Sequence, residues 1–166
     1  IAVREKINEK ELQTRSLAIA IAAMKYTMLK QDMYKNIIFN PKEAIRFEGD
    51  TGPYLLYSYA LAKSILRKAG KKQKKTMFSS VSEQEKKLIK ALGSFPEAVE
   101  HACEQIAPNL IANYAYELAQ IFNEFYHTSP VIGSEEEGWR VKLVASFAQV
   151  MHNALYLLGI PIIEKM

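Results

Sequence analysis

Apolar residues recur along most of the chain at intervals of three and four, which is the spacing of one face of an α-helix. The first such segment runs from Glu9 to Gln31. Its apolar residues lie on two faces, Leu17, Ile21, Met24 and Met28 on one and Ile19, Ala23 and Tyr26 on the other. A helix that is apolar on nearly all sides packs between partners. We therefore predict that this helix is buried, with its methionines filling the core.

Capping and stop residues divide the rest of the chain into further helices. Asn40-Pro41-Lys42-Glu43 combines a capping residue, a proline suited to the first helical position and a glutamate that can complete a capping box. Ser82-x-x-Glu85 is a second capping box. The predicted helices run from Asn40 to near Phe47, from Pro53 to Ala69, from Ser82 to Gly93, from Pro96 to Ile106, from Pro108 to the loop 130–138, and from that loop to Gly159.

Strand signals are weak, since only Ile37 to Phe39 is expected to be extended. The predicted fold class is therefore all-α, a helical bundle. Ile1 to Asn8 has the pattern of the end of an earlier helix, and the chain lacks an initiator Met. We expect it to begin within a longer sequence.

Charge is distributed unevenly along the chain. The net charge is only +4, but seven cations lie within thirteen residues that contain no acid, from Lys63 to Lys75. The segment from Ser82 to Glu104 carries five glutamates. A basic run beside an acidic one can guide a polyanion to one face, and the alternative is a solvated loop after a helix.

Residues that could support catalysis are sparse. His101, His127 and His152 stand alone, without Cys, His or Asp neighbours at ligand spacing, and the phosphate-loop and dinucleotide fingerprints are absent. We expect no catalytic residue, metal or cofactor in this chain, and expect Glu135-Glu136-Glu137 to be solvated. The single cysteine, Cys103, lies on an apolar helix face and is expected to be buried. With no internal disulfide possible and no segment apolar enough to span a bilayer, we expect a cytoplasmic protein without a membrane partner.

The most turn-rich part of the chain precedes the third predicted helix and reads Phe47-Glu48-Gly49-Asp50-Thr51-Gly52-Pro53-Tyr54-Leu55-Leu56-Tyr57. This segment resembles a signature of the arginyl-tRNA synthetases. Other matching segments follow in the family's order: Ser64 to Ala69, Phe95 to Val99, Ala107 to Leu110, Tyr114 to Tyr126, Arg140-x-x-Leu143, Leu157 to Ile160 and the ending Glu164-Lys165-Met166. The resemblance spans about Ala22 to Met166.

Three positions of the signature helix depart from the family. Leu56 stands where the family has Gln, and Leu61 and Lys63 stand where it has Arg. Polar roles at 56 and 61 are therefore in doubt, and Lys63 keeps its charge without the planar fork of a guanidinium. The two ATP-site motifs of the family, of the His-Ile-Gly-His and Lys-Met-Ser-Lys types, do not occur in this sequence.

The resemblance implies a domain division and a function. Residues 1–46 would lead from an absent catalytic core, and residues 47–166 would form the C-terminal anticodon-binding domain of a class I synthetase, within one compact unit. The expected partners are tRNA(Arg) and the catalytic domain, with no DNA partner. The parent enzyme would use ATP with Mg to arginylate tRNA, whereas this chain alone should be inactive.

The resemblance also suggests where RNA docks, against the last two long helices and the C-terminal tail. Unstacked bases are read by aromatic surfaces and polar groups, and phosphates are held by cations. The candidate tRNA-binding residues are Tyr126, Met166, Arg140, Asn153, Lys165, Arg67 and Lys68. The candidate domain-junction residues are Gly49, Thr51, Gly52, Pro53 and Tyr54, where two glycines permit a tight turn, Asp50 or Thr51 caps, and proline opens the helix.

Two other interpretations stay open at this point. A helical scaffold could bind a protein partner through its apolar helices, with the lysine run incidental. A related anticodon domain, of the cysteinyl or glycyl type, would keep the RNA and change the amino acid. The Gly-Asp-Thr-Gly-Pro-Tyr segment and the Glu-Lys-Met ending favour arginine.

Overall fold

The computed structural model describes residues 8–70 and 80–166, and these form helices joined by turns and loops, without a strand. The elements are α1 (Glu9–Leu29), α2 (Pro41–Ala44), α3 (Gly52–Ala69), α4 (Glu83–Gly93), α5 (Phe95–Glu104), α6 (Pro108–Thr128) and α7 (Glu137–Leu157). The all-α prediction is confirmed. The predicted helix end at Ile1 to Asn8 lies outside the described residues except for Asn8, as does the part of the lysine run from Lys71 to Lys75.

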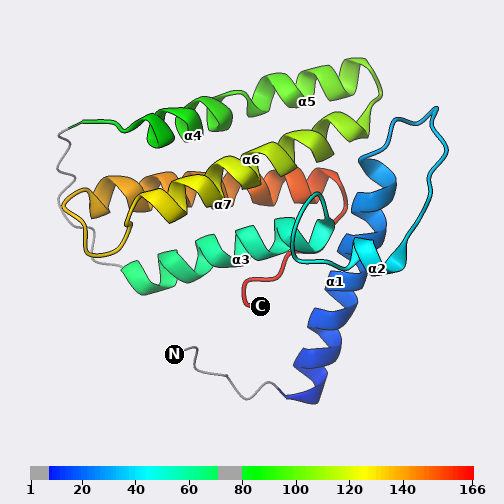
Figure 1. Cartoon of the computed structure of the whole chain (residues 1–166), viewed down its shortest axis with the longest axis horizontal. Helices are drawn as coiled ribbons and strands as arrows, with labels where there is room; N and C mark the ends of the chain where they lie inside the picture. Colours follow the sequence, from blue (N-terminus) through cyan, green and yellow to red (C-terminus); the bar gives the residue numbers. More distant parts are fainter. Residues whose placement is uncertain (1–7, 71–79) are drawn as a thin grey trace.

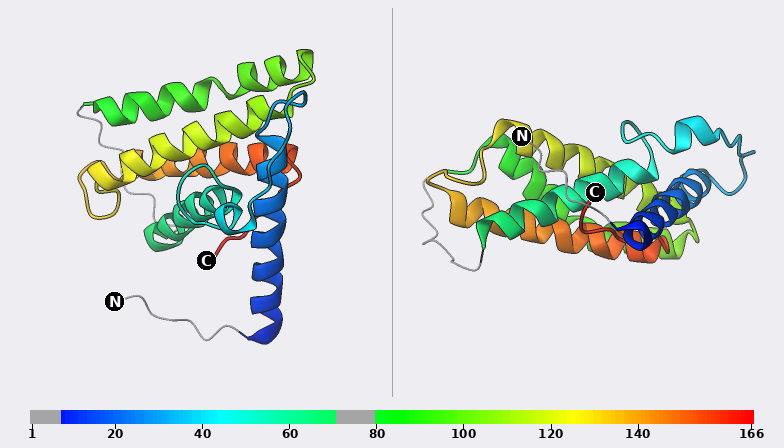
Figure 2. Two further views of the ribbon diagram at one scale, coloured as in Figure 1. Left: turned by 45° about the vertical axis from the view of Figure 1, so that its right-hand side comes forward. Right: turned by 90° about the horizontal axis from the view of Figure 1, so that it is seen from below.

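The helices α3, α6 and α7 run alongside one another, and α4 and α5 lie end to end over α6 (Figure 1). Helix α1 crosses this bundle steeply at one end, and two further views show the same arrangement (Figure 2). The core fills the space between α3, α6 and α7. Its centre is a stacked pair, Phe122 of α6 and Phe147 of α7, with ring centroids 3.7 Å apart. Leu55 and Leu56 of α3 are fully buried beside Met151 of α7.

Capping chemistry sets the helix boundaries much as the sequence predicts. The Ser82 hydroxyl accepts from the Glu85 amide at 3.2 Å, and the Glu85 carboxylate accepts from the Ser82 amide at 2.8 Å, which completes the predicted capping box. Asn40 caps α2 through the amide of Lys42. Helix α2 ends at Ala44, before the predicted end near Phe47.

Helix α1 differs most from its predicted environment. Only Ala22, Ala23 and Tyr26 are buried. The face that carries Leu17, Met24 and Met28 is exposed, and Leu17 keeps 63% of its surface. The prediction that this helix packs on all sides, with its methionines as core residues, is wrong for the chain by itself, because only one side of the crossing helix meets the bundle. Met33, in the following loop, is exposed as well, whereas Met151 of α7 is buried.

Two further burial predictions, for Cys103 and Glu137, are wrong. Cys103 is exposed, because α5 lies on the surface of the bundle and contains no buried residue. Ile106 is also exposed, in a turn where its φ of 49° is left-handed. Glu137, expected to be solvated, is buried and accepts a hydrogen bond from the Gly133 amide at 2.7 Å, so it closes the loop before α7.

Two tyrosines make stability depend on pH in the alkaline range. Burial raises the pKa of Tyr114 to about 12, and its hydroxyl donates to the Ala91 carbonyl at 2.8 Å. Burial, then the hydrogen bond to Asp50 and its negative charge, raise the pKa of Tyr26 well above its usual range. A raised pKa in the folded state means that this contribution is complete below the unfolded value of about 10 and is lost as pH rises through the folded value.

We therefore expect the free energy of unfolding to fall between about pH 10 and about pH 12, and to fall less steeply in Tyr114→Phe. Urea unfolding midpoints across this range measure the effect. Tyr34→Phe is the matched control, because Tyr34 is 92% exposed. Equal alkaline slopes for the wild type and Tyr114→Phe would contradict the prediction.

Candidate nucleic-acid interface

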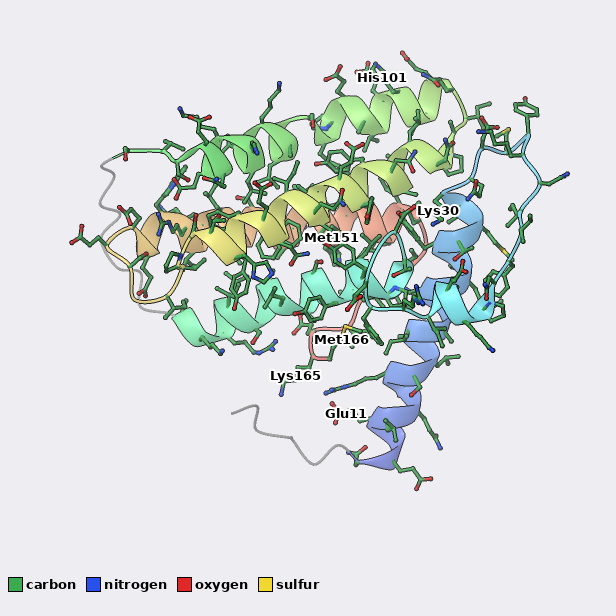
Figure 3. The ribbon with its side chains drawn as sticks, viewed as in Figure 1. Glu11, Lys30, His101, Met151, Lys165 and Met166 are labelled. Carbon is green, nitrogen blue, oxygen red and sulfur yellow. The ribbon has the colours of Figure 1, made fainter. Side chains whose placement is uncertain are left out.

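The turn before α3 binds α1 through the side chain of Asp50. The carboxylate accepts from the Tyr26 hydroxyl and from the Lys30 ammonium, which lies 2.9 Å from Oδ2 and 2.7 Å from the Asp50 main-chain oxygen. Tyr26 lies in the last turn of α1, and Lys30 is the residue directly after the helix (Figure 3 labels Lys30). The Tyr26 hydroxyl also lies 3.4 Å from the Ala112 carbonyl of α6. These contacts, made by the buried Tyr26 and the half-buried Lys30 to the exposed Asp50, therefore fix the direction of α1 relative to α3 and α6.

Thr51 is the residue that starts α3. Its Oγ1 accepts from the Tyr54 amide at 3.3 Å and donates to the Arg46 carbonyl at 2.6 Å, so it caps the helix and ties down the preceding turn. Pro53 occupies the first turn of the helix, as predicted, and Gly49 adopts a left-handed φ of 73°. These junction residues thus form the turn before α3 and the N-terminal cap of this helix.

Gly52 has a different role from the predicted tight turn. A Cβ built at this position would lie 2.2 Å from the main-chain oxygen of Ala22 and 3.0 Å from the Cβ of Tyr26. Glycine is required because the backbones of α1 and α3 approach each other here, and not because the turn needs a positive φ.

The C-terminal tail, residues 158–166, lies along α3. Glu164 pairs with Lys63 at 2.9 Å, and Nη1 of Arg67 donates to the Glu164 main-chain oxygen at 3.0 Å. Ile160 and Ile163 are buried in the bundle. The last two residues are exposed beyond these anchors, with Met166 beside α3 and Lys165 pointing away from the bundle (Figure 3).

Tyr126 lies in the last turn of α6, with 37% of its surface exposed and its ring centroid 5.8 Å from that of His127. Met166 is 44% exposed. Neither side chain is sealed in the core, so both can meet a ligand from solution. They belong to different parts of the surface: Tyr126 is next to the α6–α7 loop, and Met166 is on the tail.

Arg140 has an internal role that the sequence prediction did not anticipate. Its Nε lies 2.9 Å from Oε1 of Glu85, which is 1% exposed, and its Nη1 donates to the Pro130 carbonyl at 2.8 Å. Glu136 lies 3.6 Å from the same Nη1. Since these donors already have protein acceptors, we leave Arg140 out of the proposed RNA-binding surface.

The remaining predicted residues are dispersed. Asn153 accepts from Gln149 at 2.9 Å on α7 and lies sixteen residues after Glu137, about 24 Å along the helix at 1.5 Å per residue. It is therefore at the opposite end of α7 from Tyr126. Lys68 is exposed in the last turn of α3, one residue after Arg67. The structure thus brings Arg67, Lys165 and Met166 together, and it separates Asn153 from Tyr126.

The face of α3 that meets α6 contains polar contacts that the sequence analysis missed. Asn123 of α6 donates to the Tyr54 hydroxyl and to the Ser58 hydroxyl, both at 2.9 Å. Tyr116 packs edge-on against Tyr54, with centroids 5.8 Å apart. The helical spacing of Tyr116 and Asn123 places both on one face of α6, but periodicity cannot show which helix this face meets. The contacts of Glu164 with α3 could not be predicted for the same reason.

Comparison with known families decides the assignment. The DALR anticodon binding domain family matches residues 55–166, which is most of the chain. The chain belongs to this family. The resemblance to arginyl-tRNA synthetases drawn from the sequence is confirmed by individual relatives.

Curated relatives of this anticodon-binding domain are named arginine–tRNA ligase. One from Flavobacterium psychrophilum is 39% identical over 98% of the chain and 28% of its own length. One from Pyrococcus abyssi is also 39% identical, over 96% of the chain and 27% of its length. The solved Thermus thermophilus arginyl-tRNA synthetase superposes with a TM-score of 0.89 at 36% identity, covering 98% of the chain and 29% of that protein. The chain therefore spans less than a third of the length of each of these three relatives.

Two departures from the family's sequence pattern suit their positions in the fold. Leu56 and Leu61, which replace polar family residues, are buried and half-buried respectively, as suits apolar side chains. The described residues contain no helix that could cross a membrane and no group of three or more potential metal ligands. The predicted site residues and the division at residue 46 stay predictions.

Proposed function

We propose that this chain is the anticodon-binding domain of an arginyl-tRNA synthetase, which positions tRNA(Arg) for ATP-dependent arginylation by a catalytic domain outside this chain. The observation that carries the proposal is the anchored tail. It presents Met166 at the surface, beside cationic side chains, in a chain whose relatives are arginine–tRNA ligases. We propose that the domain binds tRNA in the cytoplasm, without a DNA or membrane partner.

The chemistry of the surface suits an unpaired RNA loop. A thioether and a phenol ring offer flat or polarisable contacts to splayed bases. Lys68 and Lys165 supply positive charge for phosphates. The family's two ATP-site motifs do not occur in this sequence, so we place the ATP–Mg site of the whole enzyme in the catalytic domain outside this chain.

The exposed face of α1 supports the second partner. Leu17, Met24 and Met28 form an apolar stripe on a helix whose other side is fixed to the bundle. Exposed stripes of this kind mark contact sites. We propose that the catalytic domain covers this stripe, and that the Tyr26–Asp50–Lys30 node keeps the two domains at a set angle.

A titration tests the proposal. We expect the chain to bind tRNA(Arg) more tightly than a version with an altered anticodon, and both affinities to fall as salt rises, because phosphate contacts release counterions. The preference between the two RNAs should survive the change in salt. A protein scaffold would show neither effect, and binding without an anticodon preference would contradict the proposed function.

Tyr126→Ala should weaken binding to tRNA(Arg) by roughly 1–3 kcal/mol, the usual range for the loss of one stacked base. Tyr34→Ala is the matched control, because Tyr34 is a more exposed tyrosine in the loop between α1 and α2. Fluorescence anisotropy with a labelled RNA measures both. Equal affinities for Tyr126→Ala and Tyr34→Ala would exclude Tyr126 from the interface.

A further inference from the structure

We propose that Lys63 and Arg67 are positioning residues, which hold the C-terminal tail against α3 so that Met166 is ordered before RNA arrives. The inference deepens the proposed function and rests on it. It also assigns Lys63 and Arg67 to contacts within the protein, whereas their positive charge alone would suggest contacts with RNA phosphates.

The two contacts to Glu164 are of different kinds. Lys63 pairs with the Glu164 side chain at 2.9 Å, with 30% of the lysine side chain and 56% of the glutamate side chain exposed. Arg67 donates to the main-chain oxygen of the same residue at 3.0 Å. The first contact neutralises a charge, and the second fixes the backbone two residues before the chain end. The hydrogen bond to Glu164 raises the pKa of Lys63, in agreement with a lysine that is already engaged.

The tail is also held upstream of Glu164. Lys25 of α1 donates to the Gly159 carbonyl just after α7, where Gly159 has a left-handed φ of 63°. Ile160 and Ile163 are buried. The chain is thus attached at Gly159, at the two isoleucines and at Glu164. The contacts with α3 lie two residues before Met166 and therefore restrict where this side chain can lie.

Order in the free protein has a direct effect on affinity. A residue that must be fixed on binding costs about 1–2 kcal/mol of conformational free energy, which a preorganised tail does not lose at that step. If Lys63 and Arg67 instead contacted phosphates, Glu164 would lower the affinity for tRNA(Arg) and not raise it. In that case the glutamate competes with RNA for the two cations, and its removal should strengthen binding.

Glu164→Gln separates the two roles by the sign of its effect. If Lys63 and Arg67 position the tail, the affinity for tRNA(Arg) falls roughly three- to tenfold, in the range expected for disordering one or two side chains. If they contact phosphates, the affinity rises or stays unchanged. Glu83→Gln is the matched control, because it also removes one acid from an exposed lysine pair, with Lys86 at 2.7 Å on α4. We expect the control to bind as the wild type does.

Two further variants connect the loss to the tail. Deletion of Lys165 and Met166 measures the whole contribution of these two residues to the affinity for tRNA(Arg). Adding Glu164→Gln to the deletion should weaken binding no further. Lys63→Met should weaken tRNA(Arg) binding as Glu164→Gln does, with an unchanged salt slope, whereas Lys63→Arg retains binding. The inference would be overturned if the losses of affinity from the deletion and from Glu164→Gln were additive. It would also be overturned if Lys63→Met reduced the slope of log affinity against log salt concentration by about one. Wild-type binding without an anticodon preference would instead overturn the proposed function.

Discussion

Gly52→Ala is expected to lower the free energy of unfolding by about 3 kcal/mol or more. The new Cβ would lie 2.2 Å from the Ala22 main-chain oxygen and 2.5 Å from its carbonyl carbon. Both atoms belong to a helix backbone and cannot rotate away as a side chain does. Helix α1 must therefore shift, and the hydrogen bonds from Tyr26 and Lys30 to Asp50 are strained with it. Urea denaturation should show a lower midpoint at an unchanged slope.

Gly93→Ala is the control for this substitution. A Cβ at Gly93, in the last position of α4, meets nothing within 4 Å, and its φ is not left-handed. Alanine there should be neutral or slightly stabilising, because it reduces the freedom of the unfolded chain. If Gly52→Ala were as stable as Gly93→Ala, the close approach of α1 to α3 would be wrong.

The second large effect is expected from the buried pair between α4 and α7. Arg140→Met should cost about 3–5 kcal/mol of stability, because it leaves the Glu85 carboxylate buried without its cationic partner. Glu85 is 1% exposed and the Arg140 side chain is 14% exposed. The same substitution frees the Pro130 carbonyl, so the loop after α6 loses its anchor as well.

A double-mutant cycle isolates this interaction. Removing both charges, in Glu85→Gln with Arg140→Met, should be less destabilising than the sum of the single changes, because neither charge is then left unpaired. Lys87→Met, which breaks the exposed pair between Lys87 and Glu124, is the control and should change stability little. Strict additivity in the cycle would contradict a coupled buried pair.

The sequence predicted the helices well because their boundaries are set by local chemistry. The Ser82 capping box, the Thr51 cap and the stop at Gly70 each involve residues within one turn of each other. The family signature likewise depends on a short segment. Features of this kind are readable without knowing which helices are neighbours.

Predictions failed where they required knowledge of packing partners. Periodicity identified the apolar stripe of Leu17, Met24 and Met28 but could not show that this chain leaves it uncovered. Arg140 was chosen as an RNA-binding candidate because cations favour phosphates, and the sequence could not show that an acid fifty-five positions away pairs with it. The Lys63–Glu164 pair spans a still longer separation. Helical spacing alone contains no information about such pairs.

The central claim is that the tail beside α3 meets the anticodon loop, and methionine methyl resonances test it most directly. The chain has six methionines, of which Met166 is on the tail, Met151 is buried, and Met24 and Met28 are exposed on α1. With methyl-labelled methionine and an unlabelled anticodon stem-loop of tRNA(Arg), we predict a large shift of the Met166 signal and unchanged signals from Met24 and Met28. Shifts confined to the α1 methionines, with Met166 unmoved at saturating RNA, would contradict the account.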